Sequence, residues 1–214
     1  TGHSSGGWSS LWLMITYPDT FGGTWSTAPD SVDFHDFQKV NLYRAGENLY
    51  VDAKNNRRPI ARKNNKVKLW YKDFDQMEQV LGHGGQLHSF EASFSPRGKD
   101  GKPVRVWDCK TGIIDTQAAK NWNKYDIKNI LTSNWKKLAP QLNGKIHLYM
   151  GEVDTFYLDG ATRNLKRAME NISADVTIEL FPGKDHSSLM DQKMRNRIRK
   201  EMTAAFLKHH PEWN

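Results

Sequence analysis

The sequence predicts an α/β fold, with a parallel sheet flanked by helices. Two stretches carry this prediction. Residues 1–30 contain a small-residue turn, a helical pattern and a short apolar strand, and residues 145–208 show the pattern strand, helix, strand, helix. Strands that alternate with helices are typical of parallel sheets joined by right-handed crossovers.

The first stretch supplies one helix and one strand. Apolar residues at helical spacing between Trp8 and Ile15 predict an amphipathic helix over residues 5–16. Pro18 follows it and ends it, because a proline one or two positions after a helix cannot continue the helix. The segment FGGTWSTAPD then predicts a buried strand over about residues 23–28.

The second stretch supplies two more strands. KIHLYM predicts a strand over residues 145–150, and the helix after it carries apolar residues on one face up to Ile172. DVTIELF predicts a strand over residues 175–181, which is followed by the loop PGKDHSS and a final helix to about residue 208.

The middle of the chain is less regular. Residues 31 to about 125 are rich in Asn, Gly, Lys and aromatic residues. SPRGKDGKPVRVWD predicts a hairpin whose turn contains Asp100-Gly101, and residues 115–138 predict short helices.

Composition sets the broad class of the protein. The 214 residues are 37% hydrophobic and 26% charged, which is enough apolar material for one sizeable core. No apolar run approaches the roughly 20 residues needed to cross a bilayer, so we expect no membrane span. Cys109 is the single cysteine, so an internal disulfide is excluded but the compartment stays open. The chain starts at Thr1 in mid-motif, so we expect a processed or excerpted polypeptide without its targeting region, soluble, with a secreted or periplasmic location favoured.

The whole chain has a net charge of +7. Its basic residues are concentrated in two segments, at 54–72 and 193–200. Such runs can bind nucleic acid or an anionic ligand. No zinc-finger spacing, RNA-binding aromatic motif or phosphate-binding loop accompanies them, so we favour solvated surfaces and do not expect nucleic acid as a partner.

The opening segment TGHSSGGWSS contains Gly2-His3-Ser4-Ser5-Gly6, which fits Gly-x-Ser-x-Gly. Alone this pattern is weak, since about one chain in ten of this length carries it by chance. Two later loops also follow predicted strands: GEVDTFYL holds Asp154 and GKDHSSLM holds His186. In parallel α/β sheets, catalytic groups collect in loops at the carboxyl ends of strands.

The chain order Ser, Asp, His is that of the α/β-hydrolase triad. On GHSSGGW, FGGTWSTAP, GEVDTFYL and FPGKDHSSLM, the sequence resembles the α/β-hydrolases, and within them the esterase group that includes enterochelin-esterase-like and feruloyl-esterase-like enzymes. The resemblance covers about residues 1–30 and 140–208. It implies a single α/β-hydrolase domain with a core of residues 1–30 and 136–214, and an inserted cap at about 31–135 that sets substrate choice.

The resemblance also implies site roles. Ser4 would attack a carbonyl carbon as nucleophile, His186 would take its proton, and Asp154 would orient the imidazole. The backbone N–H of Ser5 would donate to the oxyanion, and Gly2 and Gly6 would give the elbow room for the turn. The expected activity is hydrolysis of a small-molecule carboxylic ester through an acyl-enzyme, without cofactor or metal.

The sequence departs from the family at its amino end. The strand before the nucleophile should precede Gly2, and the upstream strands and the loop with the second oxyanion donor are absent from the sequence. We therefore expect this chain alone to be an incomplete enzyme.

Other acids and histidines are weaker candidates. Glu152 and Asp159 are lesser alternatives to Asp154, and His147 is expected to pack within a strand. His3 lies inside the elbow and is a possible pocket residue, as are His83 and His88 in or near GHGGQ at 82–86. The remaining histidines are less well placed: His35, His209 and His210. No metal site is expected, because the histidines lack i,i+4 carboxylate partners and one cysteine cannot build a zinc cage.

Three alternatives remain open. A serine peptidase of the prolyl-oligopeptidase type has the same triad order. A non-catalytic module on a hydrolase fold would use the basic insertion to bind polyanions. Thr1 as an N-terminal nucleophile is the third. If the insertion lines the pocket, its aromatic residues and Arg57 and Arg58 favour aromatic or anionic acyl groups.

Overall fold

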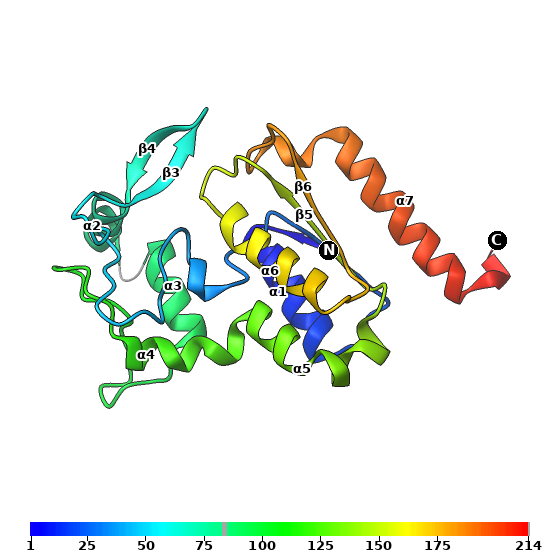
Figure 1. Cartoon of the computed structure of the whole chain (residues 1–214), viewed down its shortest axis with the longest axis horizontal. Coiled ribbons are helices and arrows are strands. Elements are labelled where there is room, and N and C mark those ends of the chain that lie inside the picture. The colour runs from blue at the N-terminus through cyan, green and yellow to red at the C-terminus, as the bar shows by residue number, and fades with distance from the viewer. Residues whose placement is uncertain (83–84, 214) are drawn as a thin grey trace.

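A computed structural model describes residues 1–82 and 85–213 (Figure 1). Four parallel strands form the central sheet in the order β1 (Gly2–His3), β2 (Thr24–Thr27), β5 (Ile146–Gly151) and β6 (Thr177–Phe181). Helices cover the sheet, so the predicted α/β fold with a parallel sheet flanked by helices is confirmed. The α/β-hydrolase identity stays a prediction.

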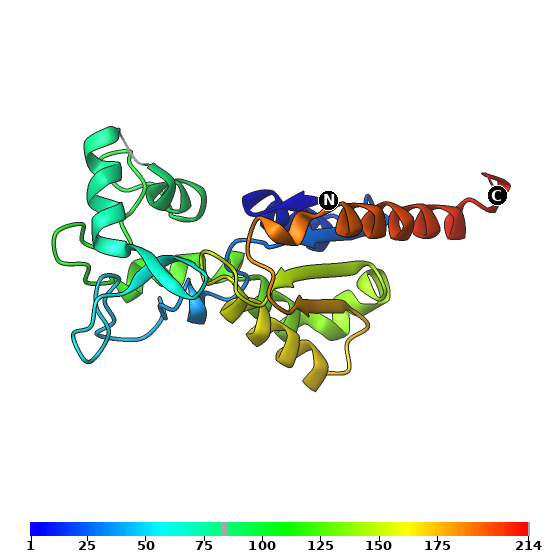
Figure 2. The same cartoon turned by 90° about the horizontal axis from the view of Figure 1, so that it is seen from above.

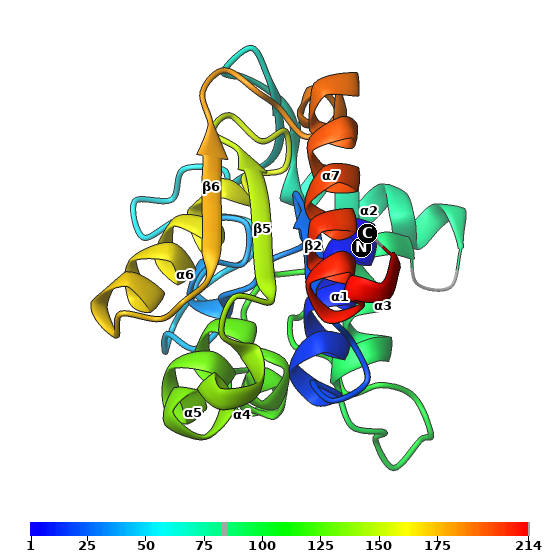
Figure 3. The same ribbon diagram turned by 90° about the vertical axis from the view of Figure 1, so that its right-hand side faces the viewer.

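The sheet is sandwiched between helices on two faces. Helix α1 (Ser5–Thr16) packs against α5 (Ile127–Leu142), and α5 packs against α6 (Asp159–Asn171), while α7 (Gln192–His209) lies on the opposite face (Figures 1 and 3). Alternation along the strands produces this arrangement, because successive side chains point to opposite faces.

Polar contacts fix α7 on its face of the sheet. Glu201 of α7 accepts hydrogen bonds from Trp25 Nε1 at 2.9 Å and from the Tyr149 hydroxyl at 2.5 Å. Arg197, one turn earlier, pairs with Glu179 of β6. Three neighbouring strands are therefore tied to one helix.

Local sequence sets the helix ends. Tyr17 is the C-cap of α1, directly before Pro18, as predicted. Asp126 caps α5 by accepting the Asn129 N–H at 3.0 Å, and Asp191 caps α7 by accepting the Met194 N–H at 2.9 Å. Such caps satisfy N–H groups that have no partner within the helix.

Residues 31–126 leave the sheet after β2 and form a second layer of structure that we call the lobe; Figure 2 shows it beside the sheet. Its elements are η1 (Phe34–Asp36), β3 (Pro59–Lys63), β4 (Lys66–Trp70), α2 (Tyr71–Leu81), α3 (Gly85–Phe94), α4 (Thr116–Lys120) and η2 (Asn121–Tyr125). Two short turns of helix, η3 (Ser188–Met190) and η4 (Pro211–Trp213), flank α7. Because α5 packs with α1 and α6, residues 127–135 lie with the sheet layer.

The hairpin of the lobe differs from the predicted one. Strands β3 and β4 are antiparallel and turn through Asn64 and Asn65, whose φ values of 51° and 59° suit a type I′ turn. In SPRGKDGKPVRVWD the turn at Gly101 forms, but a single bridge between Arg97 and Pro103 replaces the expected strands. The hairpin formed by β3 and β4 lies within the basic segment 54–72, for which the sequence predicts only a solvated surface.

An aromatic seam joins the lobe to the sheet layer. Trp8 of α1 packs on Phe94 of α3, with ring centroids 4.9 Å apart, and Trp122 contacts both Phe94 at 5.4 Å and Phe34 at 5.8 Å. Each such pair stabilises beyond its buried area, so the two layers share one core. Within residues 1–82 and 85–213, no helix combines the length and apolar character that a membrane crossing requires.

Candidate active site

Ser4 occupies a strained turn between β1 and α1. Its φ of 57° and ψ of −127° are unfavourable for a residue with a side chain. Backbone hydrogen bonds hold it there: the Ser4 N–H donates to Thr27 O at 3.0 Å, and its carbonyl accepts from the Gly7 and Trp8 N–H groups. This is the strand–turn–helix geometry that exposes a serine at the carboxyl edge of a sheet.

The glycines around Ser4 have different roles. A Cβ on Gly2 would lie 2.0 Å from the Gly6 carbonyl oxygen, so this position excludes any side chain. The prediction that a side chain at Gly6 would also obstruct the turn is wrong. Among the described residues a Cβ at Gly6 meets nothing within 4 Å. The second packing position is Gly7, where a Cβ would approach Thr27 O to 2.9 Å. The absence of a side chain at Gly7 lets α1 lie close against β2.

Asp154 and His186 form a buried pair. Asp154 is fully buried, and its Oδ2 lies 2.8 Å from His186 Nδ1. The other oxygen accepts the Phe156 N–H at 2.8 Å and the Leu158 N–H at 3.3 Å. These backbone donors fix the carboxylate. Since the carboxylate contacts Nδ1 of the imidazole, Nε2 is the ring nitrogen that does not face Asp154.

His3 connects the serine turn to this pair. Its ring centroid lies 4.7 Å from that of His186, and its Nδ1 is 3.0 Å from Thr27 Oγ1. Burial, with His186 beside it, lowers the pKa of His3, which favours the neutral form of this ring. Among the described residues no hydrogen bond joins the Ser4 hydroxyl to His186, whose ring contacts Asp154 through Nδ1.

Asp30 is a site residue that the sequence did not reveal. It is 8% exposed, accepts the Ser5 hydroxyl at 2.7 Å, and donates its own N–H to Ser4 O at 3.3 Å. Burial raises the pKa of Asp30, although hydrogen bonds from Ser5 and Ser4 oppose this. A turn at Ala28, whose φ is 40°, places Asp30 shortly after the end of β2. A charged residue directly after Pro29 was the available signal.

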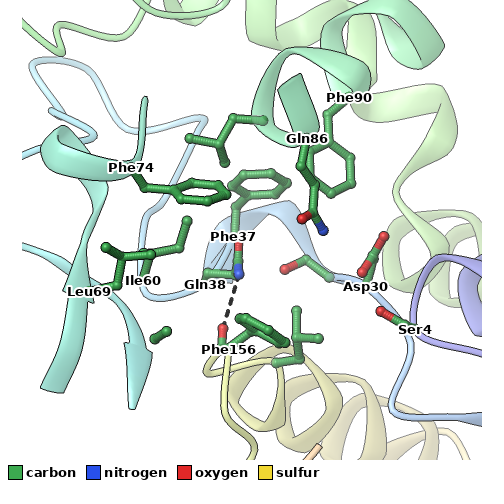
Figure 4. A pocket seen from close by; sticks show the side chains of 14 residues that line it. Ser4, Asp30, Phe37, Gln38, Ile60, Leu69, Phe74, Gln86, Phe90 and Phe156 are labelled. Carbon is green, nitrogen blue, oxygen red and sulfur yellow. Dashed lines mark hydrogen bonds between the residues drawn. The ribbon is translucent and has the colours of Figure 1, made fainter. Parts of the chain in front are cut away.

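A cavity opens beside Ser4, between the lobe and the sheet layer (Figure 4). It spans about 530 Å³, part of which is open to solvent. Its aromatic walls are Phe37, Phe74, Phe90 and Phe156, its aliphatic residues include Ile60, Leu69, Leu87 and Leu158, and its polar groups are Ser4, Asp30, Ser31, Gln38 and Gln86. The cavity is therefore mainly apolar, and Figure 4 shows Ser4 and Asp30 together at one end of it.

The weaker acid candidates have other partners. Asp159 lies in α6 and pairs with Arg62 at 2.7 Å. Glu152 lies 3.8 Å from Arg163, near the surface. Neither makes the contact with His186 that Asp154 makes.

The other histidines lie elsewhere. His147 stacks on Trp25 within the sheet, with centroids 4.7 Å apart, as expected of a packed residue. His88 is buried in the lobe between Asp75 and Glu91, while its neighbours Gln86 and Leu87 line the cavity. His83 lies outside the described residues. The other three are at least partly exposed: His35, His209 and His210.

The arginines of the lobe are used in ion pairs. Arg57 pairs with Asp73 at 2.5 Å, and Arg58 pairs with the buried Glu47. These contacts take both arginines away from the cavity lining, so they give no support to an anionic acyl group. The aromatic side chains of the cavity wall are compatible with an aromatic acyl group.

Comparison with known proteins gives no assignment, since no family model and no curated protein matches this sequence.

Proposed function

We propose that this chain carries the site of a serine hydrolase that cleaves carboxylic esters, with Ser4 as nucleophile, His186 as general base and Asp154 as its orienting acid. The observation that supports this most is the strained serine at the sheet edge, combined with a buried Asp–His pair from the loops after β5 and β6. Strained backbone of this kind persists mainly at functional sites.

The reaction follows from these positions. Ser4 Oγ attacks the ester carbonyl carbon, and the hydroxyl proton passes to His186 Nε2. The tetrahedral intermediate collapses, the C–O bond to the alcohol breaks, and Nε2 returns the proton to the leaving alkoxide. Water then attacks the acyl-enzyme in the same way and releases the acid and the free serine. Asp154 orients the imidazole and stabilises the imidazolium.

Ser5 supplies an oxyanion donor. It is the first residue of α1, so its N–H has no carbonyl one turn earlier to bind. The helix dipole also favours negative charge at this end. One such donor contributes about 10²–10³ in rate.

The cavity suggests the acyl group. Phenyl rings on several sides suit an aromatic or branched apolar acyl chain. The carboxyl of Asp30 lies beside the nucleophile. It disfavours substrates that carry a negative charge at this end of the cavity. We therefore propose neutral aryl esters as the substrate class.

The test is run on this chain and on a longer polypeptide that contains it, and it compares p-nitrophenyl esters of a neutral aryl acid and of an aryl acid bearing a carboxylate. Faster hydrolysis of the neutral ester is expected, and it should disappear in Ser4→Ala but persist in Ser9→Ala, a matched change one helical turn further along α1. A p-nitroanilide of the same acyl group separates the esterase from the peptidase alternative. Equal hydrolysis in Ser4→Ala would overturn the assignment.

The polyanion-binding alternative loses part of its basis, because Arg57 and Arg58 are engaged by acidic residues. It predicts salt-sensitive heparin binding that is indifferent to Ser4→Ala. A secreted or periplasmic location stays a prediction.

A further inference from the structure

Three side chains that commonly ligate metals meet inside the lobe, apart from the site described above. Asp75, His88 and Cys109 each offer one ligand atom, and these three atoms lie within 4.8 Å of one another. Nε2 is 3.0 Å from Oδ1 and 3.7 Å from Sγ. With zinc–ligand bonds of about 2.0–2.3 Å, ligand atoms around a tetrahedral zinc are about 3.3–3.7 Å apart. The nitrogen–sulfur spacing fits, and the nitrogen–oxygen spacing is about 0.3 Å shorter.

Asp75 has one oxygen bound and one left without a hydrogen bond. The residue is fully buried, and Oδ2 accepts the Tyr50 hydroxyl and Gln79 Nε2, the latter at 3.0 Å. Within the described residues no hydrogen bond is assigned to Oδ1, although His88 Nε2 lies 3.0 Å from it. A buried carboxylate oxygen in this state is costly, and a cation at the cluster would satisfy it.

His88 is oriented as a metal-bound histidine should be. Its Nδ1 lies 2.8 Å from Glu91 Oε2, and the Glu91 side chain is 1% exposed. Trp107 stacks on the ring at 5.0 Å. A histidine ligand usually donates its second N–H to a carboxylate, which directs the other nitrogen at the ion. Here that nitrogen faces Asp75 and Cys109, while Nδ1 contacts Arg105 as well as Glu91.

Charge allows two states of this cluster. Glu91 binds Arg105 at 3.0 Å, so those two charges cancel. Asp75 and a Cys109 thiolate then leave two negative charges, which one divalent cation neutralises. Without a cation, a Cys109 thiol and a His88 imidazolium between two carboxylates also give neutrality. The first state contains a metal and the second is an ion triad.

We propose that Asp75, His88 and Cys109 bind a divalent transition-metal ion, zinc by the chemistry of the donors. A thiolate with an imidazole selects zinc over magnesium or calcium. The three ligands come from α2, from α3 and from the loop before α4, so the ion would tie the lobe together. This site is independent of the proposed hydrolase function.

The test uses the intact chain, stripped with chelator and titrated with zinc. We expect one zinc per chain by mass spectrometry of the metal, and a melting temperature about 5–10 °C higher at zinc a hundredfold above its Kd. Cobalt should give a thiolate charge-transfer band, which reports Cys109 directly because it is the single cysteine. Cys109→Ser and Asp75→Asn should lose the metal, while a His209→Gln, His210→Gln variant, which changes two exposed histidines, should keep it.

Other outcomes overturn the site. Zinc that binds Cys109→Ser as well as the wild type, or that is lost in a His209→Gln, His210→Gln variant, would be adventitious. A folded, stripped chain that takes up no zinc and shows no cobalt–thiolate band would establish the ion triad instead. The spectroscopic result needs no variant, so a variant that fails to fold does not rescue the proposal.

Discussion

Among the described residues, two buried histidines contact buried carboxylates: His186 contacts Asp154 at the sheet edge, and His88 contacts Asp75 and Glu91 in the lobe. Asp154 contacts Nδ1 of His186, whereas Asp75 contacts Nε2 of His88. Asp154 is fixed by backbone N–H groups, and within the described part of the chain no hydrogen bond reaches Nε2 of His186. The second nitrogen of His88 contacts Glu91. The same two residue types therefore suit proton transfer in one region and ion binding in the other, according to what the second nitrogen faces.

The largest expected effect comes from breaking the first pair. Asp154→Asn should lower kcat for an aryl ester about 10⁴-fold, because the amide no longer holds the required tautomer. Steady-state hydrolysis measures this. Asp159→Asn, in the helix that follows, is the control and should stay within severalfold of wild type. A loss below tenfold in Asp154→Asn would remove Asp154 from the mechanism.

The serine turn gives the next effect. Gly2→Ala places a Cβ against the Gly6 carbonyl and should displace Ser4, and a displacement of about 1 Å costs about 10² in rate. Gly6→Ala should retain activity, since its Cβ meets open space. Rates of fluorophosphonate labelling measure both. Equal tolerance of the two alanines would contradict the elbow geometry.

Breaking the second pair should affect stability. In metal-free protein, Asp75→Asn removes one partner of a buried charged contact, which costs about 3 kcal/mol and lowers the melting temperature by about 6–12 °C. Asp73→Asn on the same helix breaks only the exposed pair with Arg57 and should cost under about 1 kcal/mol. Thermal melts decide this, and similar shifts for both would show that the cluster is not a stabilising centre.

The smallest effect concerns Asp30. Its pKa is raised in the folded state, so ionisation opposes folding and stability falls as pH rises above the ordinary value of 3.8. Asp30→Asn removes this cost, and its melting temperature should exceed that of wild type by about 2–5 °C at pH 7 but match it near pH 3. Melts across pH test this; a wild type that is the more stable at pH 7 would contradict the sign.

The sheet layer was predictable and the lobe was not. Helical spacing of apolar residues located α1 and α6, and short apolar runs bounded by turn residues located β2, β5 and β6. Asp30 was missed because its position depends on the left-handed turn at Ala28. The metal-type cluster was missed because α2 and α3 must pair before Asp75, His88 and Cys109 meet. Spacing along the chain does not encode that pairing.

The most direct test of the account is covalent labelling by a fluorophosphonate, with mass spectrometry to locate the adduct. It should be run on this chain and on a longer polypeptide that contains it. The account predicts an adduct on Ser4 that is lost in His186→Gln and retained in His147→Gln. A folded longer polypeptide with no adduct on Ser4, or an adduct that forms equally well without His186, would contradict it.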